Sequence, residues 1–265
     1  MTIPDSPLRS LRILIADESM LNRRIYTAML ERRGHTVVSV AKGREVLAEL
    51  LRDVFDVLVM DAVLPEMDGV EATEAIRSSV TDRVDASIPV IVLSGSQSEG
   101  DRERFMKAGV DGVLIKPVRI TALLKTVRDV MLHKGRQVEP GGAEEVAQVK
   151  DGQLRQLDYI LSEFGLEKDD VYSLYALMQE SLPREFAALK VASEEGWLEE
   201  VAEVAHSLAG SALDIVADGP ALVAREIEYA ARSGDVQEAR QLCVEMEPQV
   251  VKVYAEIGRL LAESA

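Results

Sequence analysis

Residues 56–69, with the sequence DVLVMDAVLPEMDG, decide the fold of the first half of the chain. The apolar run from Val57 to Met60 does not alternate with polar residues, which is typical of a strand covered on both faces. Asp61 closes this run where the expected strand ends. A buried parallel strand with a carboxylate at its carboxyl end indicates a ligand site in an open α/β sheet.

The same arrangement recurs throughout residues 1–133. Short strands rich in Val, Ile and Leu alternate with amphipathic helical stretches, and the strands are expected at 11–16, 35–40, 56–60, 88–93 and 111–115. The helices are expected near 20–32, 43–52, 68–79, 99–108 and 119–132. Five such units predict an α/β fold with a doubly wound, five-stranded parallel sheet of flavodoxin-like type.

The second half of the chain has a different pattern. Residues 134–152 contain a Pro-Gly-Gly sequence and no sustained periodicity, which predicts a linker. No strand follows it, and helices are expected at about 153–164, 168–194, 197–214, 219–232 and 235–262. An apolar stripe along the last helix predicts an all-α four-helix bundle over residues 153–265.

Charge and composition narrow the classes of function. The net charge of −16 is uneven: residues 1–132 carry −2, and the remainder carries −14. An acidic helical half argues against nucleic-acid binding, and either a solvated surface or a docking surface for basic partners remains open. The absence of a 20-residue apolar run argues against membrane insertion, and the single cysteine and lack of a signal sequence fit a cytoplasmic location.

Polar residues that follow the expected strands point to one chemical site. They lie at the carboxyl ends of separate strands and comprise Asp17, Glu18, Asp61, Ser94 and Lys116. Carboxylates, a lysine and a hydroxyl that converge there suit a divalent cation and a phosphoryl group. Taken singly, Asp17 and Glu18 could cap the next helix and Lys116 could be a surface residue, but the full set in register favours the chemical site.

Four motifs carry a family resemblance over about residues 10–132. ILIADES, DVLVMDAVLPEMDG, IPVIVLSG and VLIKPV resemble the receiver domain of two-component response regulators. The resemblance implies that Asp61 is a phosphoacceptor and that Lys116 and Ser94 contact the phosphoryl group. It also implies a Mg²⁺ cofactor held by the side chains of Asp17, Glu18 and Asp61 and the backbone carbonyl of Val63.

Two residues depart from the usual receiver pattern. Glu18 stands where Asp is commoner, and Val113 stands where many receivers carry Tyr or Phe. Without that aromatic ring, a switch must depend on the Ser94 loop alone, or else the domain relays phosphate without switching an effector. We favour the second interpretation.

The helical half resembles a histidine phosphotransfer (HPt) domain over about residues 153–265, through VAHSLAGSALDI and AREIEYAARSGD. A helical wheel puts His206 opposite the apolar face, which predicts a solvent-exposed phosphoacceptor and argues against the usual core histidine. Gly210, expected in mid-helix, would let another domain approach closely. Ala209 stands where the family usually has Lys.

Together these features predict a phosphorelay signalling protein. Asp61 accepts a phosphoryl group from the phosphohistidine of a sensor histidine kinase, and His206 exchanges it with Asp61 or with another receiver. The alternative is a receiver switch joined to a helical binding or dimerisation module in which His206 is not phosphorylated. No kinase motif is visible, so we expect a phosphotransfer intermediate and no separate enzymatic turnover, either as a stand-alone protein or as part of a hybrid kinase.

Overall fold

The computed structural model describes residues 10–81, 83–95, 98–116, 118–132, 154, 156–210 and 216–264. The chain divides into two compact units, Met1–Ala143 and Glu144–Ala265. We call them unit 1 and unit 2. The predicted linker, 134–152, lies outside the described residues.

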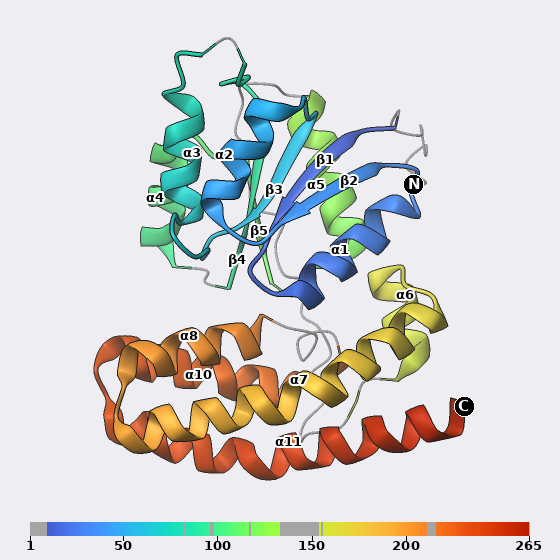
Figure 1. Cartoon of the computed structure of the whole chain (residues 1–265), viewed down its shortest axis with the longest axis vertical. Helices are drawn as coiled ribbons and strands as arrows, with labels where there is room; N and C mark the ends of the chain where they lie inside the picture. Colours follow the sequence, from blue (N-terminus) through green and yellow to red (C-terminus); the bar gives the residue numbers. More distant parts are fainter. Residues whose placement is uncertain are drawn as a thin grey trace. The chain divides into compact units, whose positions relative to one another are not determined.

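Unit 1 is built on a parallel sheet of five strands, as predicted. They are β1 (Arg12–Ala16), β2 (Thr36–Val40), β3 (Val57–Asp61), β4 (Val90–Ser94) and β5 (Gly112–Ile115), in the order β2-β1-β3-β4-β5 (Figure 1). The chain reverses its direction of winding between β1 and β3. The carboxyl ends of these two central strands therefore define the topological switch point, where open α/β sheets bind their ligands.

Helices cover both faces of this sheet. α1 (Met20–Glu31) and α5 (Ile120–Leu132) lie on one face, and α2 (Gly43–Arg52), α3 (Gly69–Arg77) and α4 (Glu99–Ala108) lie on the other (Figure 1). One hydrophobic cluster joins alternate strand residues to the second group of helices; it includes Leu58, Met60, Val46, Ile76 and Phe105. Every residue of β3 and β4 is buried, which explains why their sequences do not alternate.

Side-chain caps fix where several of these helices begin. The Ser19 side chain accepts a hydrogen bond from the Asn22 N–H at the start of α1, and Asp68 forms a reciprocal capping box with Glu71 at the start of α3. Each cap satisfies a backbone N–H that has no partner within its own helix. The loop after β1 therefore runs from a strand to the capped start of α1, and the loop after β3 runs from a strand to the capped start of α3. Each loop is fixed at both ends.

The strand register brings the functional positions to one edge. Asp61 pairs with Leu93 across β3 and β4, and Ser94 pairs with Ile115 across β4 and β5. Lys116, the next residue, donates its backbone N–H to the carbonyl of Ser94 at 2.8 Å. Polar residues that are far apart in the sequence thus lie at the same edge of the sheet, where the strands have their carboxyl ends.

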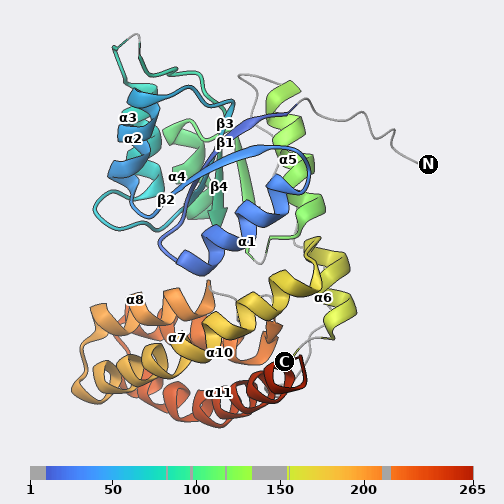
Figure 2. The same ribbon diagram turned by 45° about the vertical axis from the view of Figure 1, so that its right-hand side comes forward.

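Unit 2 is helical, and none of its described residues lies in a strand. Its helices are α6 (Leu157–Phe164), α7 (Lys168–Glu195), α8 (Leu198–Ala209), α10 (Asp218–Ser233) and α11 (Val236–Ser264). α7 packs against α8 and α11, and α10 packs against the same two helices (Figure 2). Apolar residues at three- and four-residue spacing form the buried face of α11, namely Ala239, Cys243, Met246, Val250, Val253 and Ile257.

The structure corrects the predicted helix over 197–214. α8 ends at Ala209, and Gly210 is its C-cap, with φ −86° and ψ 2°. Gly210 is therefore not in the middle of a helix. The prediction that it lets another domain approach closely, which depended on a mid-helix position, loses its support. Residues 211–215 lie outside the described part of the chain. Among the described helices, none combines the length and the apolar character that a membrane span requires.

Candidate functional site

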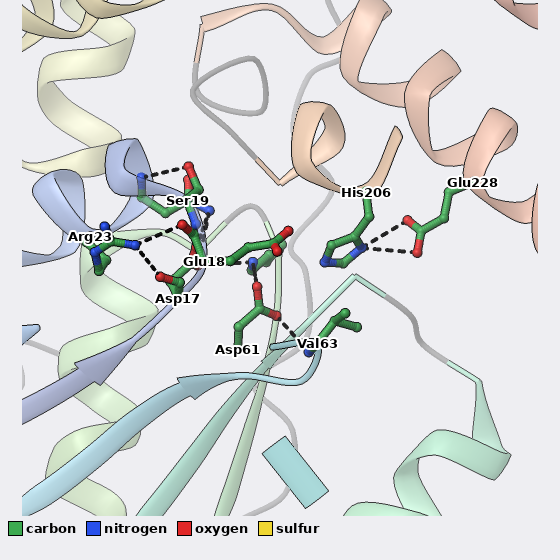
Figure 3. Close-up of polar contacts among 10 residues, drawn as sticks. Asp17, Glu18, Ser19, Arg23, Asp61, Val63, His206 and Glu228 are labelled. Carbon is green, nitrogen blue, oxygen red and sulfur yellow. Dashed lines mark hydrogen bonds and ion pairs between the residues drawn. The ribbon is translucent and has the colours of Figure 1, made fainter. Parts of the chain in front are cut away.

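A buried lysine joins two carboxylates at the switch point of unit 1. The Nζ of Lys116 lies 2.6 Å from Oδ2 of Asp61 and 3.3 Å from Oδ2 of Asp17. Asp17, Asp61 and Lys116 are 0%, 1% and 6% exposed. Figure 3 shows the two aspartates at the ends of their strands. Groups predicted from three separate motifs thus form one charged cluster.

Burial and mutual charge shift the pKa values in this cluster. Burial raises the pKa of the Asp17 carboxyl and outweighs the lowering effect of the Lys116 charge, while the charge of Asp61 raises this pKa further. For Lys116, burial acts to lower the pKa, but the two carboxylates outweigh it and hold the pKa well above its ordinary value. Lys116 is therefore a cation that two carboxylates, those of Asp17 and Asp61, share.

Two residues that the sequence reasoning did not assign hold Asp17 in place. Asn22 is buried and donates from Nδ2 to both carboxylate oxygens of Asp17 at 3.1 Å. Arg23 donates from Nη1 to the backbone carbonyls of Asp17 and Glu18 at 2.6 and 2.8 Å (Figure 3). The sequence does contain a signal for the role of Asn22. It is a polar residue three positions after the helix cap, and its position faces the sheet.

The backbone around Asp61 is tightly packed. The N–H of Val63 donates to Oδ1 of Asp61 at 3.3 Å (Figure 3). Gly69, the first residue of α3, approaches the end of β3 so closely that a Cβ there would lie 2.6 Å from the backbone oxygen of Asp61. Thr73 donates its hydroxyl to the Gly69 carbonyl at 2.6 Å. The carboxylate of Asp61 is therefore held by a tightly packed connection between β3 and α3.

The remaining predicted positions lie around the same strand ends. Ser94 is buried at the end of β4, and Val113 is buried within β5. Glu18 is half-buried in the loop after β1. Among the described residues, no group of three or more His, Cys, Asp or Glu side chains is arranged to hold a metal ion.

The donor set still fits Mg²⁺. This ion is usually held by one or two protein carboxylates and keeps several waters. Asp17 and Asp61 supply two hard oxygen donors whose mutual repulsion an added cation would relieve. The backbone carbonyl of Val63 would be the third protein ligand. Glu18 would act through a bound water.

Unit 2 contains a second polar cluster, around His206 of α8. Its Nδ1 lies 3.1 Å from both carboxylate oxygens of Glu228 on α10 (Figure 3). Arg232, one turn further along α10, contacts Oε1 of the same carboxylate from Nε at 3.0 Å and from Nη2 at 2.9 Å. The sequence reasoning missed Glu228 and Arg232, although both lie in the quoted motif AREIEYAARSGD.

The predicted exposure of His206 was wrong. The residue is 8% exposed, and two nearby residues of α8, Ala202 and Ala209, are buried as well. The helical wheel correctly put His206 on the face of α8 opposite the apolar stripe. It could not show that α10 packs against this face. The ring is thus held by a neighbouring carboxylate and does not project freely into water.

The charge of Glu228 determines which ring nitrogen carries the proton. Burial acts to raise the pKa of Glu228, but hydrogen bonds and charge from His206 and Arg232 outweigh it and lower the pKa. An ionised carboxylate can only accept hydrogen bonds. Nδ1 of His206 must therefore be the donor in this contact.

Comparison with known proteins agrees with the site in unit 1. The model of the response regulator receiver domain matches residues 13–128. Protein PilH of Pseudomonas aeruginosa is 36% identical over 120 residues, which cover 45% of this chain and 97% of PilH. Through unit 1, the chain belongs to the response regulator receiver family.

Two longer relatives are a sensor protein and a sensor histidine kinase. Sensor protein GacS of Pseudomonas syringae pv. syringae is 28% identical over 213 residues, 78% of this chain and 23% of that protein. Sensor histidine kinase AruS of Pseudomonas aeruginosa is 29% identical over 235 residues, 88% of this chain and 22% of that protein. The chain therefore spans about a quarter of the length of these two relatives.

Solved structures of receiver domains are also similar. One is the receiver domain of sensor histidine kinase PA1611 from Pseudomonas aeruginosa, which has a magnesium ion coordinated in its active site cleft. It is 30% identical and covers 46% of this chain and 98% of its own, with a TM-score of 0.42.

Proposed function

We propose that this protein is a phosphorelay intermediate in which Asp61 accepts a phosphoryl group and His206 exchanges it. The observation that carries the first step is the contact of Asp61 with Lys116 at 2.6 Å, beside the second carboxylate of Asp17. Asp61 is a buried carboxylate, the ammonium of Lys116 lies beside it as a fixed cation, and the carboxylate of Asp17 can bind a metal cation. This combination of groups is suited to phosphoryl transfer.

The reaction at Asp61 is a displacement at phosphorus. A carboxylate oxygen of Asp61 forms the new O–P bond while the N–P bond of a kinase phosphohistidine breaks, and the departing imidazole keeps the electron pair. Lys116 balances the charge on the acyl phosphate, and Ser94 donates its hydroxyl to a phosphoryl oxygen. When bound, Mg²⁺ would neutralise the remaining charge of the carboxylates and the phosphoryl group.

Val113 supports a relay and not a switch in unit 1. It is a buried aliphatic residue of β5, three positions before Lys116. A valine has no ring that could rotate inward in response to a phosphoryl group at Asp61. The phosphoryl group then needs another destination, and His206 offers one.

The second step concerns unit 2, for which we propose a four-helix bundle of HPt type. The closed packing of α7, α8, α10 and α11 supports this assignment. The matches to GacS and AruS are longer than unit 1, so they extend into unit 2. Both relatives are sensor proteins, which supports kinase and receiver proteins as partners of this chain.

The second candidate is a receiver joined to a silent helical module. The burial of His206 favours it, because a phosphoryl donor must reach the imidazole. Ala209 favours it too, because no cation stands one turn along α8 from His206. The hydrogen bond from His206 to Glu228 favours the relay instead, because it orients the ring for reaction at its other nitrogen.

Chemical stability of the bound phosphate distinguishes the two candidates. The full chain is incubated with Mg²⁺ and acetyl phosphate, a small-molecule donor to carboxylates. The relay predicts two phosphorylated species: an acyl phosphate that hydroxylamine cleaves, and a phosphohistidine that is stable to alkali and labile to acid. Asp61→Ala should abolish both, whereas His206→Ala should leave only the acyl phosphate. Acyl phosphate without any phosphohistidine in the unmodified chain would support the silent module.

A further inference from the structure

The helix α11 carries apolar residues on its solvent side as well as on its buried face. Val244 and Val251 are 69% and 60% exposed. Pro248 and Ala255 are exposed too, and each follows one of these valines by one helical turn. Residues spaced in this way lie in one line along a helix, and a line of exposed apolar residues indicates a surface for another protein. We call Val244, Pro248, Val251 and Ala255 the α11 stripe.

The spacing of the α11 stripe is that of a coiled-coil seam. In a heptad repeat lettered a to g, apolar residues at a and d recur at alternating intervals of three and four. The two valines of the stripe take d positions, and its proline and alanine take a positions. The next d and a positions are Gly258 and Ala262, which are also uncharged. The stripe therefore fits the side of a second helix.

Charged residues flank the stripe in a self-complementary order. Arg240 and Glu247 take g positions on one side of it, and Glu245 and Lys252 take e positions on the other. When two such helices run in parallel, a g residue of one faces the following e residue of the other. Arg240 of one copy would then face Glu245 of the second, and Glu247 would face Lys252. Both contacts join opposite charges, and a two-fold axis forms each of them twice.

We propose that the α11 stripe is the interface of a homodimer, in which the α11 helices of two copies of this chain pair in parallel. This inference does not depend on the proposed phosphotransfer. The direction follows from the charges. In an antiparallel pair e positions face e positions, so Lys252 of one copy would lie opposite Lys252 of the other near the centre of the stripe. Such like-charge contacts oppose association, whereas the parallel pair neutralises both e residues.

The charge of the chain favours a second copy over an unrelated basic partner. The residues after 132 carry a net charge of −14, so a basic partner would be attracted to much of unit 2 without selecting the stripe. The two basic and two acidic residues that flank the stripe cancel each other. Two acidic copies can therefore approach at this face with little local repulsion.

Contacts within unit 2 already hold the g residues. Nζ of Lys190 on α7 lies 2.7 Å from Oε1 of Glu247, and Nε of Arg240 donates to the backbone carbonyl of Ser193 at 2.8 Å. The g side of the stripe therefore borders α7, and the e side is the one away from it. Side chains that are fixed before association lose less conformational entropy when a second copy binds.

Pairing through α11 leaves α8 uncovered. α11 packs against α7 and α10, and α8 packs against the same two helices, so α8 and α11 are diagonal to each other in unit 2. A dimer of this kind is therefore compatible with access of another protein to α8. Because the stripe is narrow and exposed ion pairs contribute little each, we expect the dimer to be weak and reversible.

Sedimentation equilibrium of the full chain, from micromolar to millimolar concentration, tests whether the dimer forms. We expect a reversible equilibrium between monomer and dimer. Val251→Lys should weaken it by about tenfold or more, because it places two like charges at the centre of the seam. Leu222→Lys is the matched control, since Leu222 is 47% exposed on α10 and should not affect association. A chain that stays monomeric at millimolar concentration, or equal effects of the two substitutions, would overturn the proposal.

Exchange of the flanking charges tests the parallel pairing. Glu245→Lys combined with Lys252→Glu keeps the net charge and leaves the contacts of Glu247 and Arg240 with α7 intact. It turns every contact between e and g residues into a like-charge contact, so we expect the dimer to weaken by about 10- to 100-fold. Unchanged association of this variant, with the helix content of the parent by circular dichroism, would overturn the parallel pairing.

A second variant, Arg240→Glu combined with Glu247→Lys, should also associate poorly by itself. An equimolar mixture of the two variants should form a heterodimer about as readily as the parent forms its homodimer, because every contact between e and g residues is again between opposite charges. A mixture that associates no better than the separate variants would contradict the proposal.

Discussion

At the scale of single residues, Lys116 carries the positive charge on which the stability of unit 1 depends most. Its ammonium is buried between the carboxylates of Asp17 and Asp61. Without it, two negative charges face each other at the end of a sheet with no cation between them. The same arrangement would favour an added divalent ion there, because the ion would offset the charge of the two carboxylates.

We therefore expect Lys116→Ala to destabilise unit 1 by about 3–5 kcal/mol, the range for removal of one partner from a buried ion pair. Mg²⁺ should restore part of this loss, because it substitutes for the missing charge. Hydrogen exchange of the β3 and β4 amides with and without Mg²⁺ measures the effect within unit 1. Lys107→Ala, whose side chain is 79% exposed, should change protection by less than about 0.5 kcal/mol. A Lys116→Ala variant as stable as Lys107→Ala would contradict the inference that the charge of Lys116 stabilises unit 1.

His35 predicts an acid dependence of the stability of unit 1. Its Nδ1 accepts a hydrogen bond from the backbone N–H of Leu11 at 3.3 Å, and burial lowers its pKa below the ordinary value of 6.5. The unfolded chain therefore binds this proton more readily than the folded one. The stabilisation is complete above pH 6.5 and is lost as the pH falls from there through the lowered pKa, with a slope of at most about 1.4 kcal/mol per pH unit.

The experiment compares amide protection in β1 between pH 7.5 and 5 in the parent and in His35→Gln. Glutamine can accept the same hydrogen bond but does not titrate in this range, so the slope assigned to His35 should disappear. If both proteins lose protection equally on acidification, another group is responsible.

At the scale of secondary-structure elements, the sequence predicted unit 1 closely and unit 2 less so. Each expected strand lies within two residues of the observed one, because strands buried on both faces are unbroken apolar runs with polar residues at their ends. α8 was predicted five residues too long, because the pattern continues past the Gly210 cap. The exposure of His206 was predicted wrongly for a related reason: one helix's periodicity does not reveal which face a second helix covers.

Gly69 shows how one element constrains the next. A methyl group at this position would lie 2.6 Å from the backbone oxygen of Asp61. We expect Gly69→Ala to push α3 away from the end of β3, to destabilise unit 1 by about 1–3 kcal/mol and to slow phosphorylation of Asp61 by acetyl phosphate. Gly100→Ala in α4 is the matched control, because no atom lies within 4 Å of a Cβ there, and it should stabilise by about 0.5–1 kcal/mol. Similar effects of the two substitutions would show that the close approach of α3 is unimportant.

At the scale of the whole molecule, the sequence predicted two chemical centres but not all the residues that contact them. Glu228 is 22 positions away from His206 along the chain, and no local periodicity connects the two. The pairing arises from the packing of α10 on α8. Asn22 and Arg23, in contrast, lie at most six residues after Asp17, so a closer reading of that motif could have assigned them.

Tethering of the two centres predicts transfer within one molecule. If the 19 residues of the predicted linker behave as a flexible chain, they span roughly 25 Å on average and give an effective concentration on the order of millimolar. The intact protein should therefore move phosphate between Asp61 and His206 at a rate independent of dilution. A micromolar mixture of Asp61→Ala and His206→Ala chains should transfer much more slowly. Equal rates in the intact protein and the mixture would contradict transfer within one molecule.

The contact between Asp17 and Lys116 joins residues 99 positions apart, and this separation has a consequence for biosynthesis. A ribosome adding about 5–20 residues per second needs roughly 5–20 seconds to proceed from one to the other. In the later part of that interval, once Asp61 has been added, a nascent chain holds both aspartates but lacks β5 and the lysine that follows it. On the proposed function, Asp61 can accept a phosphoryl group efficiently only after the last strand of the sheet and Lys116 have been made, and we expect chains that end before Lys116 to be poor phosphoryl acceptors.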